Sequence, residues 1–268
     1  MKFNQIFNVT AITTRNLLLG GNMISLSLAR NPKQMINYIS ESLFLYKALN
    51  QRRGIPQKNV YEVLSAENVE TVKLGSLKEG EAWFMSSASY TTDIINLCMI
   101  CQIIKPKIVF EIGTMRGYTA FHFALNSPDD SKIYTLDLPK SEAVSHKLKT
   151  TVIDDVHVQS YLNSQKYQFE ASDVASKINC LFSDSATFDF SPYYHKVDFF
   201  FIDGAHSYEY VKRDTMNALE CCHPGSVIAW HDFGCVGVNG VSKLVIEMAE
   251  KYNIYSIPGG SVAFMVLE

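Results

Sequence analysis

The sequence predicts an α/β fold in which a mostly parallel sheet carries helices on both faces. From about residue 80 onward, short β-rich runs alternate with segments of helical periodicity. The β-rich runs are apolar at nearly every position, as in "VDFFFIDG" at 197–204, which is typical of strands covered on both faces. The last two runs have no helix between them, so one of them should run antiparallel to the rest.

The elements can be placed in order along the chain. A helix is expected over 89–104, because its apolar run ends at Lys105 and Pro106. A long polar segment over 140–175 is also expected to be helical, and Pro224 with Gly225 should end the helix before the fifth strand. The expected strands are 107–113, 132–138, 178–184, 197–204, 226–233, 253–257 and 262–268, and the other helices are 118–127, 207–222 and 241–252.

Apolar positions are irregular in the first 80 residues, whereas strand-like and helical segments alternate after them. This difference divides the chain into a helical N-terminal appendage over 1–80 and a larger domain over 81–268. A helical pattern in the appendage ends at "RRGIP", where glycine and proline break it. A lid over a binding site and a contact between subunits are its two expected roles. The apolar character of this region favours a homodimer over a monomer.

Composition excludes several functional classes. The chain has 268 residues, a net charge of −3 and no Lys/Arg run that could follow a phosphate backbone, so nucleic acid is not an expected partner. The longest apolar stretches, of about ten residues, are too short to span a membrane. The N-terminal segment lacks the features of a signal peptide, so a cytoplasmic location is expected.

A glycine-bearing turn follows the first predicted strand in "KIVFEIGTMRGYTAF". Ligands of such sheets bind beyond the carboxyl ends of the strands, where a helix start offers free N–H groups. Gly113 would allow a tight turn, and Gly117 a close approach of the backbone to a ligand or to the next helix. The middle glycine of GxGxxG is missing, and Arg116 stands where a pyrophosphate needs a small residue. The turn therefore favours a nucleoside without phosphate, although an ordinary strand-to-helix turn explains it equally well.

Acidic residues follow the next two predicted strands. Asp137 ends "IYTLD", 26 residues after Glu111, where a carboxylate can accept hydrogen bonds from ribose hydroxyls. Asp184 and Ser185 follow the third strand, where they could meet the edge of a nucleobase. Each acid would serve equally as a helix cap or loop residue, and for Asp184 taken alone the capping role is favoured.

Four ionisable residues gather at the ends of two adjacent predicted strands. Asp203 ends one strand, with His206 three residues later, and His231 and Asp232 end the next strand. Two carboxylates with imidazoles nearby suit general-base chemistry or a divalent cation with oxygen ligands. A structural role would suffice for a single histidine, but four such groups at neighbouring strand ends favour a functional site.

The segments "VFEIGTMRGYTA", "IYTLDL", "FIDGAHSYEYVKRD" and "PGSVIAWHDF" together resemble the class I S-adenosylmethionine-dependent methyltransferases. More narrowly, they resemble the small-molecule O-methyltransferase group that includes the macrocin-type sugar enzymes. The resemblance covers about residues 80 to 268. It implies a Rossmann-like, seven-stranded sheet with a C-terminal antiparallel hairpin. It also implies methyl transfer from S-adenosylmethionine to a hydroxyl of a small-molecule acceptor.

The resemblance further implies which residues contact the cofactor. The two glycines would pass under its methionine part, the acid after the second strand would hold the ribose hydroxyls, and the pair after the third strand would lie by the adenine. Asp203 would lie near the sulfonium. The expected cofactor-binding residues are Glu111, Gly113, Thr114, Gly117, Thr119, Asp137, Asp184, Ser185 and Asp203.

The same resemblance implies the catalytic residues. In the sugar-modifying members the histidine of D-x-x-H is the general base, which falls on His206 here. Magnesium is held in those relatives by acids on the two strand ends, which correspond to Asp203 and Asp232. His231 stands where some relatives carry a further carboxylate. Because magnesium prefers oxygen ligands, this histidine counts against a requirement for magnesium.

Two other hypotheses stay open. One is a nicotinamide-dependent oxidoreductase on a similar sheet, which the missing glycine and Arg116 disfavour. The other is a methyltransferase-like fold kept as a non-catalytic binding module, which the acids at every expected strand end disfavour.

Overall fold

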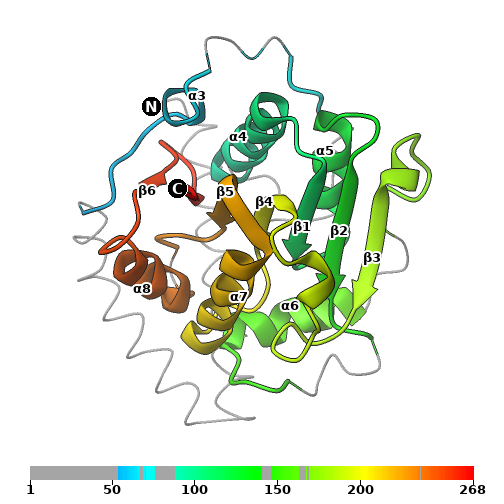
Figure 1. The fold of residues 1–268 in the computed structure, drawn as a ribbon. Helices are drawn as coiled ribbons and strands as arrows, with labels where there is room; N and C mark the ends of the chain where they lie inside the picture. The colour runs from blue at the N-terminus through cyan, green and yellow to red at the C-terminus, as the bar shows by residue number, and fades with distance from the viewer. Residues whose placement is uncertain are drawn as a thin grey trace, which may run out of the picture.

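A computed structural model describes residues 54–66, 69, 71–75, 88–140, 146–162, 167, 169–235 and 237–268. The described residues build one seven-stranded sheet in the order β3-β2-β1-β4-β5-β7-β6 (Figure 1). Its strands are β1 (Ile108–Ile112), β2 (Lys132–Asp137), β3 (Ile178–Phe182), β4 (Val197–Ile202), β5 (Cys222–Trp230), β6 (Ile254–Ser256) and β7 (Ala263–Val266).

The strand directions agree with the sequence pattern. Strands β1 to β5 run parallel to one another. Strand β7 pairs antiparallel with both β5 and β6, so it alone runs against the other described strands. The predicted fold class, with its closing antiparallel hairpin, is thereby confirmed.

Helices cover both faces of the sheet (Figure 1). Phe110 and Phe200 face a core shared with α7 and α8, whereas their neighbours Val109 and Phe199 face a core shared with α3, α4 and α5. This alternation follows from the strand period of two, and it explains why nearly every strand residue is apolar. The helices are α3 (Val60–Val63), α4 (Ala88–Ile104), α5 (Tyr118–Asn126), α6 (Val152–Leu162), α7 (Tyr208–Cys221) and α8 (Asn239–Met248), with 3₁₀ turns at Ala175–Lys177 and Ser191–Tyr193.

The predicted long helix over 140–175 is wrong. Helix α6 begins only at Val152, because Thr151 and Asp154 form a reciprocal cap: the Thr151 N–H donates to Asp154 Oδ2, and the Asp154 N–H donates to Thr151 Oγ1. Residues 169–174 form turns instead, with N–H groups bonded to carbonyls three residues back, as between Ser172 and Phe169. A polar segment without an apolar stripe gives no sign of where a helix stops.

Strand β5 begins earlier than expected. The sequence places Pro224 and Gly225 outside the strand, but the chain is extended from Cys222 onward. The pairing with β4 shifts register between Val197 and Phe199, which accommodates the extra residues as a bulge. Proline is tolerated there because a bulge leaves its position without a required ladder hydrogen bond.

The chain from Gly54 to Leu64 packs onto the larger domain. The Lys58 N–H donates to the Ser256 carbonyl, and the Ser256 N–H donates to the Pro56 carbonyl, so this segment lies along the outer edge of β6. Ile55 and Val60 are buried in the two cores. Residues 1–53, which carry most of the predicted appendage, lie outside the described residues. No described helix has the length and apolar character needed to cross a membrane.

Candidate active site

The carboxyl ends of the central strands meet at one end of the sheet, with α6 crossing below them in Figure 1. Backbone hydrogen bonds continue past the strand ends and keep neighbouring strand ends in register. The N–H groups of Gly113, Asp203 and His231 donate to the carbonyls of Leu136, Ile112 and Ile202, respectively. Residues that follow different strands in the sequence therefore become neighbours at this edge.

Gly113 allows the tips of β1 and β4 to approach each other. Its φ is +104°, and a Cβ atom at this position would lie 2.0 Å from the carbonyl oxygen of Asp203. Both facts require glycine. Asp203 therefore lies directly beside this turn.

Glu111 is fully buried beneath the turn. The hydroxyl of Thr135 donates to its Oε2, and the hydroxyl of Thr114 lies 2.7 Å from that of Thr135. Among the described residues, none makes a hydrogen bond to Glu111 Oε1. Burial raises the pKa of Glu111 to about 8, so the group holds its proton at neutral pH.

Asp137 ends β2 and braces the same turn. The N–H of Met115 donates to its Oδ2 and the N–H of Leu138 to its Oδ1. A carboxylate has about four acceptor positions, so it keeps capacity for a ribose hydroxyl. Burial raises the pKa of Asp137 to about 6, although the backbone N–H groups of Met115, Leu138 and Thr114 favour the ionised form.

Gly117 and Thr119 lie at the start of α5. Gly117 has φ +71°, and a Cβ there would lie 2.3 Å from Cε1 of Phe169. The close approach that this glycine permits is therefore to an aromatic ring, which stacks in turn on Tyr167. Thr119 is half-buried in the first turn of α5.

Asp184 and Ser185 are both buried after β3. Asp184 accepts hydrogen bonds from the N–H groups of Lys147 and Ala186 and from the hydroxyl of Tyr210. These contacts give Asp184 the capping and bracing role that the sequence alone favoured for it.

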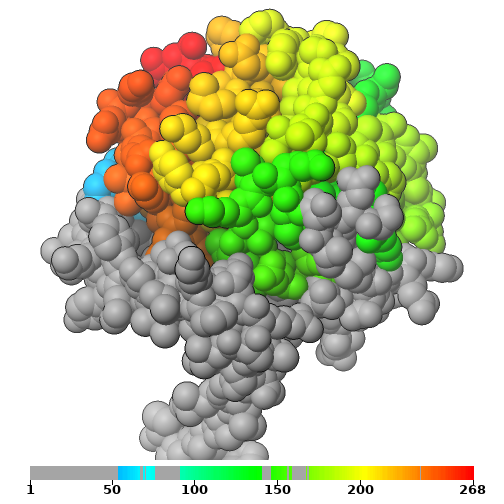
Figure 2. Space-filling view, turned by 90° about the horizontal axis from the view of Figure 1, so that it is seen from below, coloured from blue at the N-terminus to red at the C-terminus, as the bar shows by residue number. Residues whose placement is uncertain are grey.

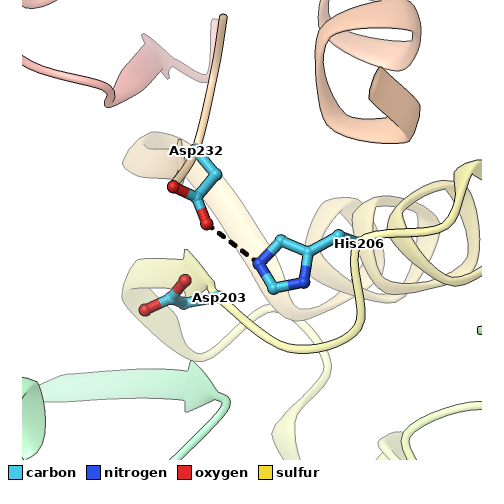
Figure 3. A group of neighbouring side chains, drawn as sticks. All are labelled: Asp203, His206 and Asp232. Carbon is cyan, nitrogen blue, oxygen red and sulfur yellow. Dashed lines mark hydrogen bonds and ion pairs between the residues drawn. The ribbon is translucent and has the colours of Figure 1, made fainter. Parts of the chain in front are cut away.

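Asp203, His206 and Asp232 converge at the ends of β4 and β5 (Figure 3). One ligand atom from each lies within 4.8 Å of the others. His206 Nε2 is 2.9 Å from Asp232 Oδ2. Asp232 adopts φ +58°, a left-handed conformation that aspartate tolerates better than most residues.

His231 contacts both carboxylates of this cluster. Its Nδ1 is 3.1 Å from Asp203 Oδ1 and 3.5 Å from Asp232 Oδ1, and its Nε2 is 3.6 Å from Asp93 Oδ2. Asp93, on α4, also accepts from the backbone N–H and the hydroxyl of Ser261. The structure therefore brings together the four ionisable residues that the sequence predicted, and adds Asp93.

Asp154 is a second addition. It is buried on α6 and accepts from the backbone N–H of His206 at 3.0 Å and from its ring Nδ1 at 2.6 Å. His157, one turn along the same helix, places its ring 5.8 Å from that of His206. In Figure 2, green atoms of the α6 region border yellow atoms of the chain that leads into α7, in agreement with these contacts.

No sequence signal placed Asp154 or Asp93 at the site, because both lie on helices rather than at strand ends. The closest hint was an isolated acid within the apolar run "TTDIINL" at 91–97, since a carboxylate buried in a helix needs a partner.

The ion pairs of this site join four carboxylates to two imidazoles: Asp93, Asp154, Asp203 and Asp232 to His206 and His231. Burial alone would lower the pKa of His206, but its bonds with Asp154 and Asp232 raise it to about 10. Asp203 and Asp232 likewise raise the pKa of His231 well above its usual range, against the effect of burial. The two imidazoles hold the pKa of Asp232 well below its usual range. Such surroundings favour a positively charged ligand.

Residues 110–233 match a protein-family model described as a methyltransferase domain. This part of the chain is therefore similar to methyltransferase domains. The match runs from β1 to just beyond β5, so it contains every residue predicted for the site. The resemblance seen in the sequence is confirmed at this level.

Two curated relatives also match the chain. A caffeoyl-CoA O-methyltransferase from Stellaria longipes is 28% identical over 134 residues, which are 50% of this chain and 49% of the relative. Tapetum-specific methyltransferase 1 from Arabidopsis thaliana is 30% identical over 99 residues, covering 32% of this chain and 42% of the relative. The chain thus matches about half the length of these relatives or less.

Solved structures that resemble the chain include the O-methyltransferase TomG from Streptomyces achromogenes in complex with SAM. It is 14% identical with a TM-score of 0.46, over 78% of this chain and 87% of that one. An O-methyltransferase from Bacillus cereus in complex with SAH is 18% identical with a TM-score of 0.41, over 77% and 88%. Superpositions at these scores are too loose to transfer a role to any residue.

Proposed function

We propose that this chain transfers the methyl group of S-adenosylmethionine to a hydroxyl of a small-molecule acceptor. The observation that carries the proposal is the convergence of Asp203, His206 and Asp232 beside the Gly113 turn, within a segment that matches a methyltransferase domain. The curated relative named for methyl transfer to an oxygen supports O-methylation.

The residues present fit the cofactor. Asp137 keeps acceptor capacity for a ribose hydroxyl, and Glu111 offers a buried oxygen with no partner among the described residues. Asp203 ends β4 beside the turn, where an acid would favour the positive sulfonium. Thr114, Gly117, Thr119, Asp184 and Ser185 complete the proposed binding residues.

The proposed reaction is an in-line displacement. The bond between the methyl carbon and sulfur breaks as a carbon–oxygen bond forms, so the sulfonium becomes the neutral thioether of S-adenosylhomocysteine. The protein has to align the two reacting atoms and to accept the hydroxyl proton. The acid-rich strand tips supply the surroundings for both tasks.

His206 was predicted to accept that proton, and the geometry sets a condition on this role. Both ring nitrogens already have carboxylate partners, Asp154 and Asp232. To act as the base, the ring must exchange its bond with Asp232 for one with the acceptor. Asp203 and Asp232 are also the residues that would hold a divalent cation, which would lower the pKa of the acceptor hydroxyl.

Calorimetric titration with S-adenosylhomocysteine and with NADH tests the proposal. We expect binding of the adenosyl thioether and no binding of NADH, because the turn lacks the middle glycine of a pyrophosphate site. Tight binding of NADH without binding of the thioether would support the oxidoreductase hypothesis instead. Binding without turnover over a broad panel of phenols, sugars and other hydroxylated compounds would favour the non-catalytic module.

The ribose role of Asp137 has its own test. We expect Asp137→Ala to weaken the binding of S-adenosylhomocysteine by about tenfold to a hundredfold, since hydrogen bonds to a charged group contribute about 1.5–3 kcal/mol. Asp189→Ala, an exposed acid after β3, is the control. Unchanged affinity in the Asp137 variant would remove this residue from the cofactor site.

A homodimer completes the proposal. It rests on the apolar N-terminal region. Sedimentation of the full chain would test the oligomeric state, and a monomer at micromolar concentration would contradict it.

A further inference from the structure

Residues 71–75 form a strap along α5, and two side chains of that helix hold it in place. Asn126 pairs with both the N–H and the carbonyl of Lys73, at 2.8 Å each. One turn earlier on the helix, Nε2 of His122 accepts a hydrogen bond from the N–H of Gly75 at 3.2 Å. An amide does not titrate near neutral pH but an imidazole does, so the two attachments respond differently to acid.

The bonds of His122 fix which ring nitrogen carries its proton. Nδ1 lies 2.8 Å from the carbonyl oxygen of Tyr118, which can only accept, so Nδ1 carries the proton. Nε2 therefore directs its lone pair at the N–H of Gly75. A second proton on Nε2 would set two N–H groups against each other. The bond to the strap thus exists only while the ring is neutral.

Neither group can turn to water while the strap stays in place. His122 is fully buried. A Cβ atom at Gly75 would lie 2.1 Å from Cε1 of Phe121, so the backbone of the strap lies directly on the helix. Val72 packs against a small buried cluster formed by Ile94, Cys98 and Tyr118. Protonation would leave a charged ring and a peptide N–H without partners inside the protein, which costs free energy until the strap moves away.

The surroundings of His122 do not offset this cost. Burial lowers the pKa of His122, and the bond to the Tyr118 carbonyl opposes this effect. The titratable residues on the helices and the strap around the ring are Lys73, Asp93, Cys98, Cys101 and Tyr118. Burial raises the pKa of Tyr118 and of Cys101 to about 12 each, and that of Cys98 well above its usual range, so all three are neutral in acid. Asp93 bonds to Ser261, and Lys73 is exposed.

We propose that the strap is held by an acid-sensitive latch: His122 keeps residues 71–75 on α5 at neutral pH and releases them when it is protonated. In the released state the ring meets water and regains its ordinary pKa of 6.5. The released state then binds a proton that the held state does not bind. The ratio of held to released chains therefore falls by up to about tenfold for each pH unit below that value. This latch goes beyond the proposed function and does not rest on it.

Hydrogen exchange of the full chain at pH 7.5 and pH 5.0 tests the latch. The rates are expressed as protection factors, which removes the pH dependence of exchange in an unstructured peptide. We expect the protection of residues 71–75 to fall about threefold to thirtyfold at the lower pH. His122→Gln places a neutral amide near the position of Nε2, so it should lose most of this pH dependence.

Two further variants are controls. His223→Gln removes a histidine that pairs with Asp198 at 3.2 Å near the start of β5, and it should keep the wild-type change. Asn126→Ala should lower the protection of the strap at both pH values and keep their ratio. If His122→Gln does not fold, ¹⁵N spectra of the wild-type chain labelled at histidine decide the question. They should show His122 protonated at Nδ1 alone at pH 7.5, and at both nitrogens where the protection is lost.

Three results would overturn the proposal: equal protection at the two pH values in the wild type, an equal fall in His122→Gln, or a proton on Nε2 at pH 7.5. The measurements need neither cofactor nor acceptor. Failure to bind S-adenosylhomocysteine would therefore leave the latch standing, and loss of the latch would leave the proposed function unchanged.

Discussion

At the scale of single residues, Glu111 shows how a strand tip changes the chemistry of a carboxyl group. In the folded chain it keeps its proton up to about pH 8, whereas its ordinary pKa is 4.5. Between these values the unfolded state binds fewer protons than the folded state, so the free energy of unfolding falls as pH rises. A neutral replacement of the same shape removes this pH dependence.

We therefore expect Glu111→Gln to become more stable relative to the wild type as the pH is raised from about 5 to about 8. The gain should be at most about 1.4 kcal/mol for each pH unit. Thermal melts of both proteins across this range measure it. A difference in melting temperature that stays constant with pH would show that Glu111 is ionised in the folded chain.

Single residues also show which parts of the site can be predicted from the sequence. Asp203, His206, His231 and Asp232 were found because they follow strands, and the ends of neighbouring parallel strands must meet. Asp154 and Asp93 reach the same cluster from helices, and the packing of a helix over the strand tips leaves no local pattern. Asp184 also follows a strand, but its partners Lys147 and Tyr210 come from distant segments, and no local pattern identifies them.

At the scale of elements, strands were predicted better than helix bounds. Continuous apolar runs identify a strand that is covered on both faces. The polar segment before β3 contains no signal for the end of a helix, and its caps are visible only as side-chain hydrogen bonds in the structure.

Asn126 at the end of α5 makes another side-chain hydrogen bond to the backbone. Its side chain pairs with both the N–H and the carbonyl of Lys73, at 2.8 Å each, as a neighbouring strand would.

We expect Asn126→Ala to expose the peptide bond after Lys73. The loss of two hydrogen bonds costs about 1–3 kcal/mol locally, so trypsin should cleave there about fivefold faster or more. Mass spectrometry of timed digests identifies the cut. Asn179→Ala, which removes an exposed amide on β3, is the control and should not change the rate. Equal rates for the two variants would show that Asn126 does not hold this segment.

At the scale of the whole molecule, the division of the chain at residue 80 can be tested by truncation. Ile55 and Val60 are buried in the two cores, although they precede that boundary. A chain that begins at residue 54 keeps both side chains and is the reference for the comparison. A chain that begins at residue 81 should lose at least about 3 kcal/mol, because burial of each of these side chains contributes about 1.5–3 kcal/mol. Equal melting temperatures would place the boundary where the sequence suggested.

The segment along β6 has a consequence for self-association. Open sheet edges carry unpaired N–H and C=O groups and are templates for strand addition. Pro56 and Lys58 bond to Ser256 and so occupy the outer side of β6. Within the described part of the chain no strand flanks β3 at the other end, where Phe182 is 53% exposed. Among the described strands, β3 is therefore the edge left open to pairing with a strand of a second molecule.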